Sequence, residues 1–123
     1  MTAWSDDELA RIGAAEELQS APRRADGSTV APTTIWVVRA GDELFVRSYR
    51  GRDGGWFTQA LPTHEARIRA AGVARDVQLT EPGPSVRGAV DEAYRTKYDH
   101  YRTYVEPMIA DAAAAATFRL TPR

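Results

Sequence analysis

TTIWVVRAGDELFVRS, residues 33–48, places two apolar runs on either side of Gly41-Asp42. A two-residue loop with glycine first is typical of a type II′ β-hairpin. Counting from this loop predicts the cross-strand pairs Ala40–Glu43, Val38–Phe45, Val37–Val46, Trp36–Arg47 and Ile35–Ser48. Both faces are largely apolar, so we expect the hairpin to be buried on both sides, in a closed barrel, under a helix or in a subunit interface.

The two faces of this hairpin are expected to differ in role. Leu44 and Val46 lie on the face that we expect to point into the barrel core. Trp36 and Arg47 lie on the other face, which continues into residues 50–56. This second face is where we expect a ligand or a second subunit to bind, provided that the register holds.

Composition limits the class of protein. A chain of 123 residues is expected to form one domain, 1–123. It has no cysteine, which excludes disulfides and thiolate metal sites. The net charge of −1, with arginines interleaved among acidic residues, argues against nucleic-acid binding. Neither a secretory leader nor a membrane-spanning apolar run is visible, so we expect a cytoplasmic protein that does not bind membranes.

Local signals predict the remaining elements. Ser5 followed by Glu8 is a capping box, and the helix that it begins is expected to end near Gln19 because Pro22 follows. Strands are expected over 21–24, 28–38, 65–71, 73–80 and 117–121, with a short helical turn over 56–61 and a long helix over 85–105. This order favours a small antiparallel barrel with helices packed outside.

Four segments carry a resemblance to a known family: IWVVRAGDELFVRSYRGRDGGWF, RIRAAGVARDVQLT, DEAYRTKYDHY and ATFRLTPR. They resemble the bacterial domain-of-unknown-function 2255 family. That family is similar to the flavin- and deazaflavin-binding split β-barrels, which include pyridoxamine-phosphate-oxidase-like and deazaflavin-dependent nitroreductase-like proteins. The resemblance implies an α+β split β-barrel of about six strands, with an N-terminal helix and a long C-terminal helix outside. It also implies a homodimer with FMN or a deazaflavin at the subunit interface.

Seven residues are candidates for cofactor binding. Guanidinium groups suit phosphate oxygens, tryptophans offer stacking surface, and the glycine-rich loop over 51–55 could form an anion nest. The candidates are Arg23, Arg24, Trp36, Arg47, Ser48, Arg50 and Trp56. Each has a structural alternative: solvated turn arginines, a Trp36–Arg47 cation–π pair, a surface loop, or a tryptophan that plugs the barrel end.

A group of tyrosines gives the catalytic candidates. Tyr94, Tyr98 and Tyr101 share one face of the predicted helix, and Lys97 lies beside them. A positive charge lowers the pKa of a nearby tyrosine, which would suit a general acid. Tyr98, Tyr101 and Lys97 are therefore the catalytic candidates; the alternative is a tyrosine face that packs on the barrel. His64 and His100 lack metal-site spacing, so no metal is expected.

These observations leave alternative functions. The first is a small-molecule-binding enzyme, a flavin- or deazaflavin-dependent oxidoreductase acting on a small aromatic or conjugated metabolite. The second is a cofactor-independent enzyme of the isomerase, cyclase or lyase type, or a plain binding module. It is favoured by RRADG at 23–27, where deazaflavin enzymes often carry a Gly-Arg/Lys-x-Ser-Gly turn. The third is a structural protein whose hairpin makes a homodimer.

Overall fold

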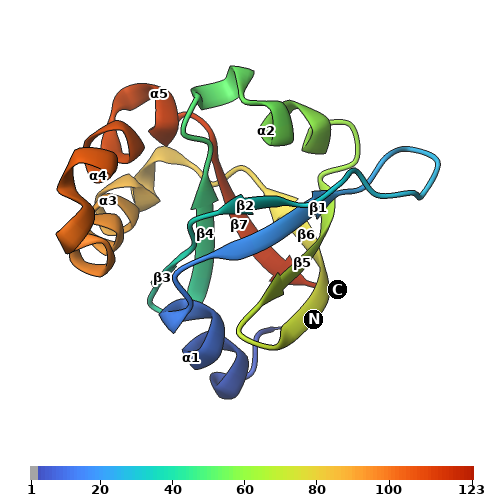
Figure 1. The fold of residues 1–123 in the computed structure, drawn as a ribbon, viewed down its shortest axis with the longest axis horizontal. Helices are drawn as coiled ribbons and strands as arrows, with labels where there is room; N and C mark the ends of the chain where they lie inside the picture. The colour runs from blue at the N-terminus through green and yellow to red at the C-terminus, as the bar shows by residue number, and fades with distance from the viewer. Residues whose placement is uncertain (1–2) are drawn as a thin grey trace.

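One curled antiparallel sheet organises the computed structural model, which describes residues 3–123 (Figure 1). Its strands are β1 (Leu18–Pro22), β2 (Thr33–Ile35), β3 (Val38–Ala40), β4 (Glu43–Arg47), β5 (Glu65–Ala70), β6 (Val73–Thr80) and β7 (Thr117–Pro122), in the order β2-β1-β5-β6-β7-β4-β3. The helices are α1 (Asp6–Ala14), α2 (Gly55–Ala60), α3 (Arg87–Lys97), α4 (Arg102–Ile109) and α5 (Asp111–Ala114), with 3₁₀ turns η1 (Gly51–Asp53), η2 (Pro84–Val86) and η3 (Asp99–Tyr101). The predicted α+β barrel with outer helices is confirmed.

The central hairpin forms with the predicted register near its loop. Val38 pairs with Phe45, and Ala40 pairs with Glu43. Gly41 has a φ of +63°, whereas the φ of Asp42 is not positive, as a type II′ loop requires. The three pairs predicted beyond Val38 are absent from the ladder, so that part of the prediction is wrong.

The first arm of the hairpin breaks at residues 36–37. Before the break, β2 pairs with β1 at one edge of the sheet, and after it β3 pairs with β4 at the other edge. The chain therefore connects the two sheet edges directly, as Figure 1 shows. Because neither strand includes Val37, its backbone groups need other partners, and side chains of the C-terminal half supply them.

The hairpin is buried on both faces, as expected. Leu44 and Val46 belong to the barrel interior, together with residues of α1, α2, β5, β6 and β7. Val38 and Phe45 face outward and are covered by α3 and α4, which contribute Val90, Tyr94, Val105 and Met108. In Figure 1, α1 and α2 lie at opposite ends of the barrel and α3–α5 lie along one side. The two apolar faces therefore serve two separate cores.

The N-terminal helix is shorter than predicted. Its capping box is present, with Ser5 and Glu8 bonding to each other's backbone N–H. The helix ends at Ala14 and not near Gln19, because residues 18–22 form β1. This strand pairs with both β2 and β5, and those ladders outweigh the helical spacing of the local sequence.

The long helix predicted over 85–105 is wrong as one element. It is divided into α3 and α4 by the η3 turn. Tyr98, just before this turn, and Tyr101, its last residue, have non-helical backbone angles, and residues 99–101 have low helix propensity. Tyr98 is buried against the barrel, which fixes where the chain turns. Tyr94, Tyr98 and Tyr101 therefore do not share the one continuous helix face that the sequence predicts.

Candidate functional site

Two adjoining cavities lie where the β2–β3 break, the end of β4, α2 and α4 approach one another. The smaller, of about 270 Å³, is lined by Thr34, Ile35, Trp36, Arg47, Tyr49, Trp56, Tyr104 and Met108. The larger, of about 410 Å³, is lined by Thr33, Thr34, Ile35, Ser48, Tyr49, Arg50, Gly54, Gly55, Trp56 and Gln59. We call them together the tryptophan groove. It brings together Trp36, Arg47, Ser48, Arg50 and Trp56, five of the seven predicted cofactor-binding residues.

The lining of the tryptophan groove is aromatic and free of carboxylates. Trp36 and Trp56 are partly buried, whereas Tyr49 and Tyr104 are 59% and 61% exposed at the rim. Within residues 3–123 the indole N–H groups of both tryptophans have no hydrogen-bond partner. Arg47 and Arg50 are the charged residues in the lining. Such a surface suits a flat conjugated ring that carries acceptor or anionic atoms.

Trp36 is held by Tyr98 and not by Arg47. The two rings stack with their centroids 3.8 Å apart and an interplanar angle of 3°. The Arg47 guanidinium lies over the ring of Tyr94 instead, 5.5 Å from its centroid. The cross-strand Trp36–Arg47 pair predicted from the register is therefore wrong, although both side chains line the same cavity.

Arg47 is fixed by contacts from three elements. It is 2% exposed, and its Nη1 donates to Asp91 Oδ1 at 2.5 Å and to the Met108 carbonyl at 3.0 Å. Its Nε donates to Thr117 Oγ1 at 3.0 Å. A buried charge needs such partners. The guanidinium is consequently a rigid wall of the groove.

The segment after β4 holds Arg50 beside the tryptophans. The N–H groups of Gly51 and Gly54 bond to the carbonyls of Ser48 and Gly51, so the loop uses them internally. A Cβ at Gly54 would lie 2.1 Å from Ser48 Oγ, so any other residue there would force the Ser48 side chain to shift. Arg50 is exposed and has no carboxylate partner in the described part of the chain. It is the cation of the groove that a ligand can reach most freely.

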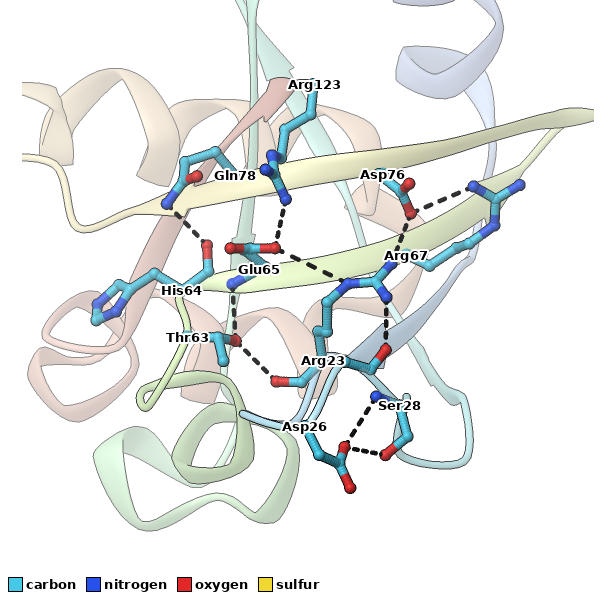
Figure 2. Close-up of polar contacts among 11 residues, drawn as sticks. Arg23, Asp26, Ser28, Thr63, His64, Glu65, Arg67, Asp76, Gln78 and Arg123 are labelled. Carbon is cyan, nitrogen blue, oxygen red and sulfur yellow. Dashed lines mark hydrogen bonds and ion pairs between the residues drawn. The ribbon is translucent and has the colours of Figure 1, made fainter.

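Arg23 and Arg24 lie away from the groove. Figure 2 shows Arg23 between Glu65 and Asp76, and its Nη2 donates to Asp76 Oδ1 at 3.0 Å. Hydrogen bonds from Arg67 and the charge of Arg23 lower the pKa of Asp76. Arg24 donates to Ser28 Oγ and to the Thr29 carbonyl. Both arginines therefore bond in and beside the 23–29 turn, and neither lies near the tryptophans of the groove.

Lys97 and Tyr98 form hydrogen bonds with backbone groups at the β2–β3 break. Lys97 Nζ donates to the carbonyls of Ala15 and Val37, at 2.5 and 2.6 Å. The Tyr98 hydroxyl donates to the Glu16 carbonyl at 2.7 Å and accepts from the Val37 N–H at 3.3 Å. Neither side chain lines the groove. These contacts are structural, and the catalytic role stays a prediction.

The pKa of Tyr98 moves opposite to the sequence-based expectation. Burial raises it, whereas the neighbouring lysine was expected to lower it. Tyr101 is 36% exposed, and its pKa is raised by a hydrogen bond with Glu16. Its ring lies 6.0 Å from that of Trp36 but outside the lining of the groove. Neither tyrosine is thus activated as an acid by Lys97.

Lys97 should give stability a distinctive pH dependence. Burial lowers its pKa from 10.5 to about 8. Between these values the unfolded chain binds more protons than the folded chain, so this residue makes the free energy of unfolding rise with pH. From about pH 7.5 to about pH 9.5, the wild type should gain about 1 kcal/mol relative to Lys97→Met, a figure reduced for partial exposure. Urea unfolding measured at each pH tests this, and parallel curves would contradict it.

Several groove residues were not predicted from the sequence. Tyr104 and Met108 come from α4, whose direction depends on the η3 turn, and Thr34 comes from the short strand β2. Tyr49 directly follows Ser48, so continuing the hairpin by one residue would have found it. Among the described residues no group of three or more histidine or acidic side chains is arranged to hold a metal ion. No helix there is long and apolar enough to cross a bilayer.

Solved structures share this fold at low sequence identity. A "conserved hypothetical protein Rv2991 from Mycobacterium tuberculosis" matches with a TM-score of 0.65 and 15% identity, over 99% of this chain and 82% of its own. An "F420 Reductase" matches with a TM-score of 0.56 and 10% identity, over 98% and 96%. No curated protein sequence gives a significant match. A family model matches residues 8–120, and the chain therefore belongs to the DUF2255 family, described as "Uncharacterized protein conserved in bacteria".

Proposed function

We propose that this protein is an oxidoreductase that binds a flavin or a deazaflavin in the tryptophan groove and acts on a small aromatic or conjugated metabolite. The observation that carries the proposal is the aromatic, carboxylate-free lining, in which two indole N–H groups have no hydrogen-bond partner within residues 3–123. The shared fold with an F420 reductase, named for a deazaflavin cofactor, supports it. Fold alone does not fix chemistry, so the groove is the stronger argument.

The groove residues fit the ring of such a cofactor. Trp36, Trp56 and Tyr104 supply aromatic surface, and the indole N–H groups match the carbonyl and ring-nitrogen acceptors of a flavin. The Arg50 guanidinium is available for an anionic tail in the larger cavity. When bound, the cofactor supplies hydride transfer. The chain's own residues orient the ring and exclude water from one side.

Contacts around the groove hold its walls in place. Tyr98 stacks on Trp36 and so fixes the plane of the indole. Trp56 lies in the first turn of α2 and contacts Phe57 and Phe118 of the barrel core, with centroids about 6 Å away. Rigid walls reduce the ordering cost of binding. This preorganisation favours a ligand that is itself flat and rigid.

Titration with coloured cofactors tests the proposal. FMN and a deazaflavin are added separately to the full chain. We expect the visible spectrum of at least one of them to change on binding. Trp56→Leu should weaken that binding by about tenfold, the loss expected for a stacked aromatic pair. Trp4→Leu is the control, because Trp4 packs by α1 and bonds the Leu120 carbonyl outside the groove. No spectral change with either cofactor would overturn the cofactor proposal.

A second candidate is a cofactor-independent enzyme or plain binding module. Two arginines in this region already have carboxylate partners: Arg47 pairs with Asp91, and Arg52, outside the groove lining, pairs with Glu81 at 2.5 Å. Arg50 is the exposed cation of the groove lining and so the expected partner for a phosphate. Riboflavin lacks the phosphate of FMN, so comparing the two measures this contact. Equal affinities would show that Arg50 does not hold the phosphate, and binding of simple aromatic compounds without any flavin response would favour the second candidate.

We also propose that the protein is a homodimer. Tyr49 and Tyr104 are the large side chains at the rim of the groove that remain mostly exposed. A second subunit packed over this rim would cover them and enclose the ligand. Sedimentation velocity measures the mass directly. A monomer at concentrations well above those used for binding would contradict the proposal.

A further inference from the structure

Arg47 offers one guanidinium nitrogen that the fold leaves unused. Its Nε and Nη1 make all three of its hydrogen bonds. Nη2 has no partner within residues 3–123. It is not fully buried, so it keeps some contact with solvent space. The side chain as a whole is nevertheless almost completely buried. Arg47 is thus a rigid donor with one free position.

The carboxylates near Arg47 only partly neutralise the guanidinium groups around it, so a further anion can be bound there. Asp91 also lies 3.5 Å from Arg87, so two guanidinium groups share this carboxylate. Arg87 contacts Asp111 as well, but the Asp111 side chain is 96% exposed and its charge is screened by water. A planar guanidinium with a free nitrogen suits a carboxylate oxygen, and an apolar setting strengthens that bond.

Arg47 borders two cavities, and their linings decide where an anion would bind. The cavity on the α5 side, of about 280 Å³, is lined also by Glu81, Arg87 and Asp111, so its two carboxylates offset the second guanidinium. The smaller cavity of the tryptophan groove contains no carboxylate and is walled by Ile35, Trp36 and Met108. Its volume of about 270 Å³ is at the small end of ligand pockets, which restricts the occupant to a small molecule.

We propose that the metabolite bound here is a planar conjugated carboxylate, with its ring against Trp36 and its carboxylate on Arg47. This inference rests on the proposed function in taking the tryptophan groove as the ligand site, but it does not depend on a flavin. The aromatic wall recognises the ring, and the fixed guanidinium recognises the acid. A neutral analogue of the same shape keeps only the first interaction.

Calorimetric titration with 2-naphthoate and 2-naphthamide tests the proposal on the full chain. The wild type should bind 2-naphthoate at least about tenfold more tightly than the amide, the difference expected for a hydrogen bond to a charged group. Arg47→Lys keeps a cation beside Asp91 but loses the fork, and it should remove most of this preference while leaving the amide unaffected. Arg69→Lys is the matched control, because Arg69 is exposed on β5 outside the groove.

Three outcomes would overturn the proposal: equal wild-type affinities for the two probes, no binding of either, or Arg47→Lys weakening both equally. The wild-type comparison needs no variant and so stands even if Arg47→Lys folds poorly. Glu81→Gln locates the anion, because a large gain in 2-naphthoate affinity would place it in the α5-side cavity instead. A missing flavin response with a clear 2-naphthoate preference would remove the cofactor proposal and keep this inference.

Discussion

Replacing Arg47 with methionine should lower the free energy of unfolding by about 3–5 kcal/mol, because it removes one partner of a buried ion pair. The Asp91 side chain is only 14% exposed and would keep the more distant Arg87 as its remaining cation. Thr117 Oγ1 and the Met108 carbonyl would also lose their donor. Urea unfolding, followed by tryptophan fluorescence, measures the change.

Two further variants show whether the ion pair is the cause. Arg47→Met combined with Asp91→Leu should recover much of the loss, since replacing a buried pair with apolar side chains is often close to neutral. Arg87→Met is the matched control: the Arg87 side chain is 42% exposed, and its loss should cost less than about 1 kcal/mol. A double variant as unstable as Arg47→Met alone would instead assign the cost to lost packing.

The hairpin loop and the β5–β6 pair could be predicted because their signals are local. Gly41 needs a positive φ, and alternation along β5 buries Ala66 and Ile68 while exposing Arg67. The break at residues 36–37 has no such signal, since residues 35–38 read as one continuous apolar strand. It arises because this segment must leave one sheet edge and join the other. Closing a barrel is a global requirement that local propensity does not encode.

The candidate site was partly predictable for the same reason. Trp36, Arg47, Ser48, Arg50 and Trp56 come from one continuous stretch of hairpin, loop and α2, so proximity in sequence placed them together. The contribution of α4 depends on the η3 turn, which depends in turn on how Tyr98 docks on the barrel. Asp91, the partner of Arg47, is 44 residues away in the chain, and only the packing of α3 brings the two together.

Tyr98→Phe should lower the free energy of unfolding by about 1–3 kcal/mol, because the Val37 N–H and the Glu16 carbonyl lose a buried partner. The stack on Trp36 would remain. Tyr98→Ala, which removes the stacked ring as well, should cost about 3–5 kcal/mol. Tyr101→Phe is the control, since this hydroxyl is outside the barrel closure and its loss should change stability by less than about 0.5 kcal/mol.

The same variant separates the structural role of Tyr98 from the catalytic role predicted from the sequence. A hydroxyl that only closes the barrel affects turnover through folding, so the Tyr98→Phe protein that remains folded should keep its rate. A hydroxyl that transfers a proton would lose turnover with little change in stability. The hydroxyl faces the backbone of residues 16 and 37, its pKa is raised by burial, and it lies outside the groove lining. We therefore expect the loss to appear in unfolding and not in rate.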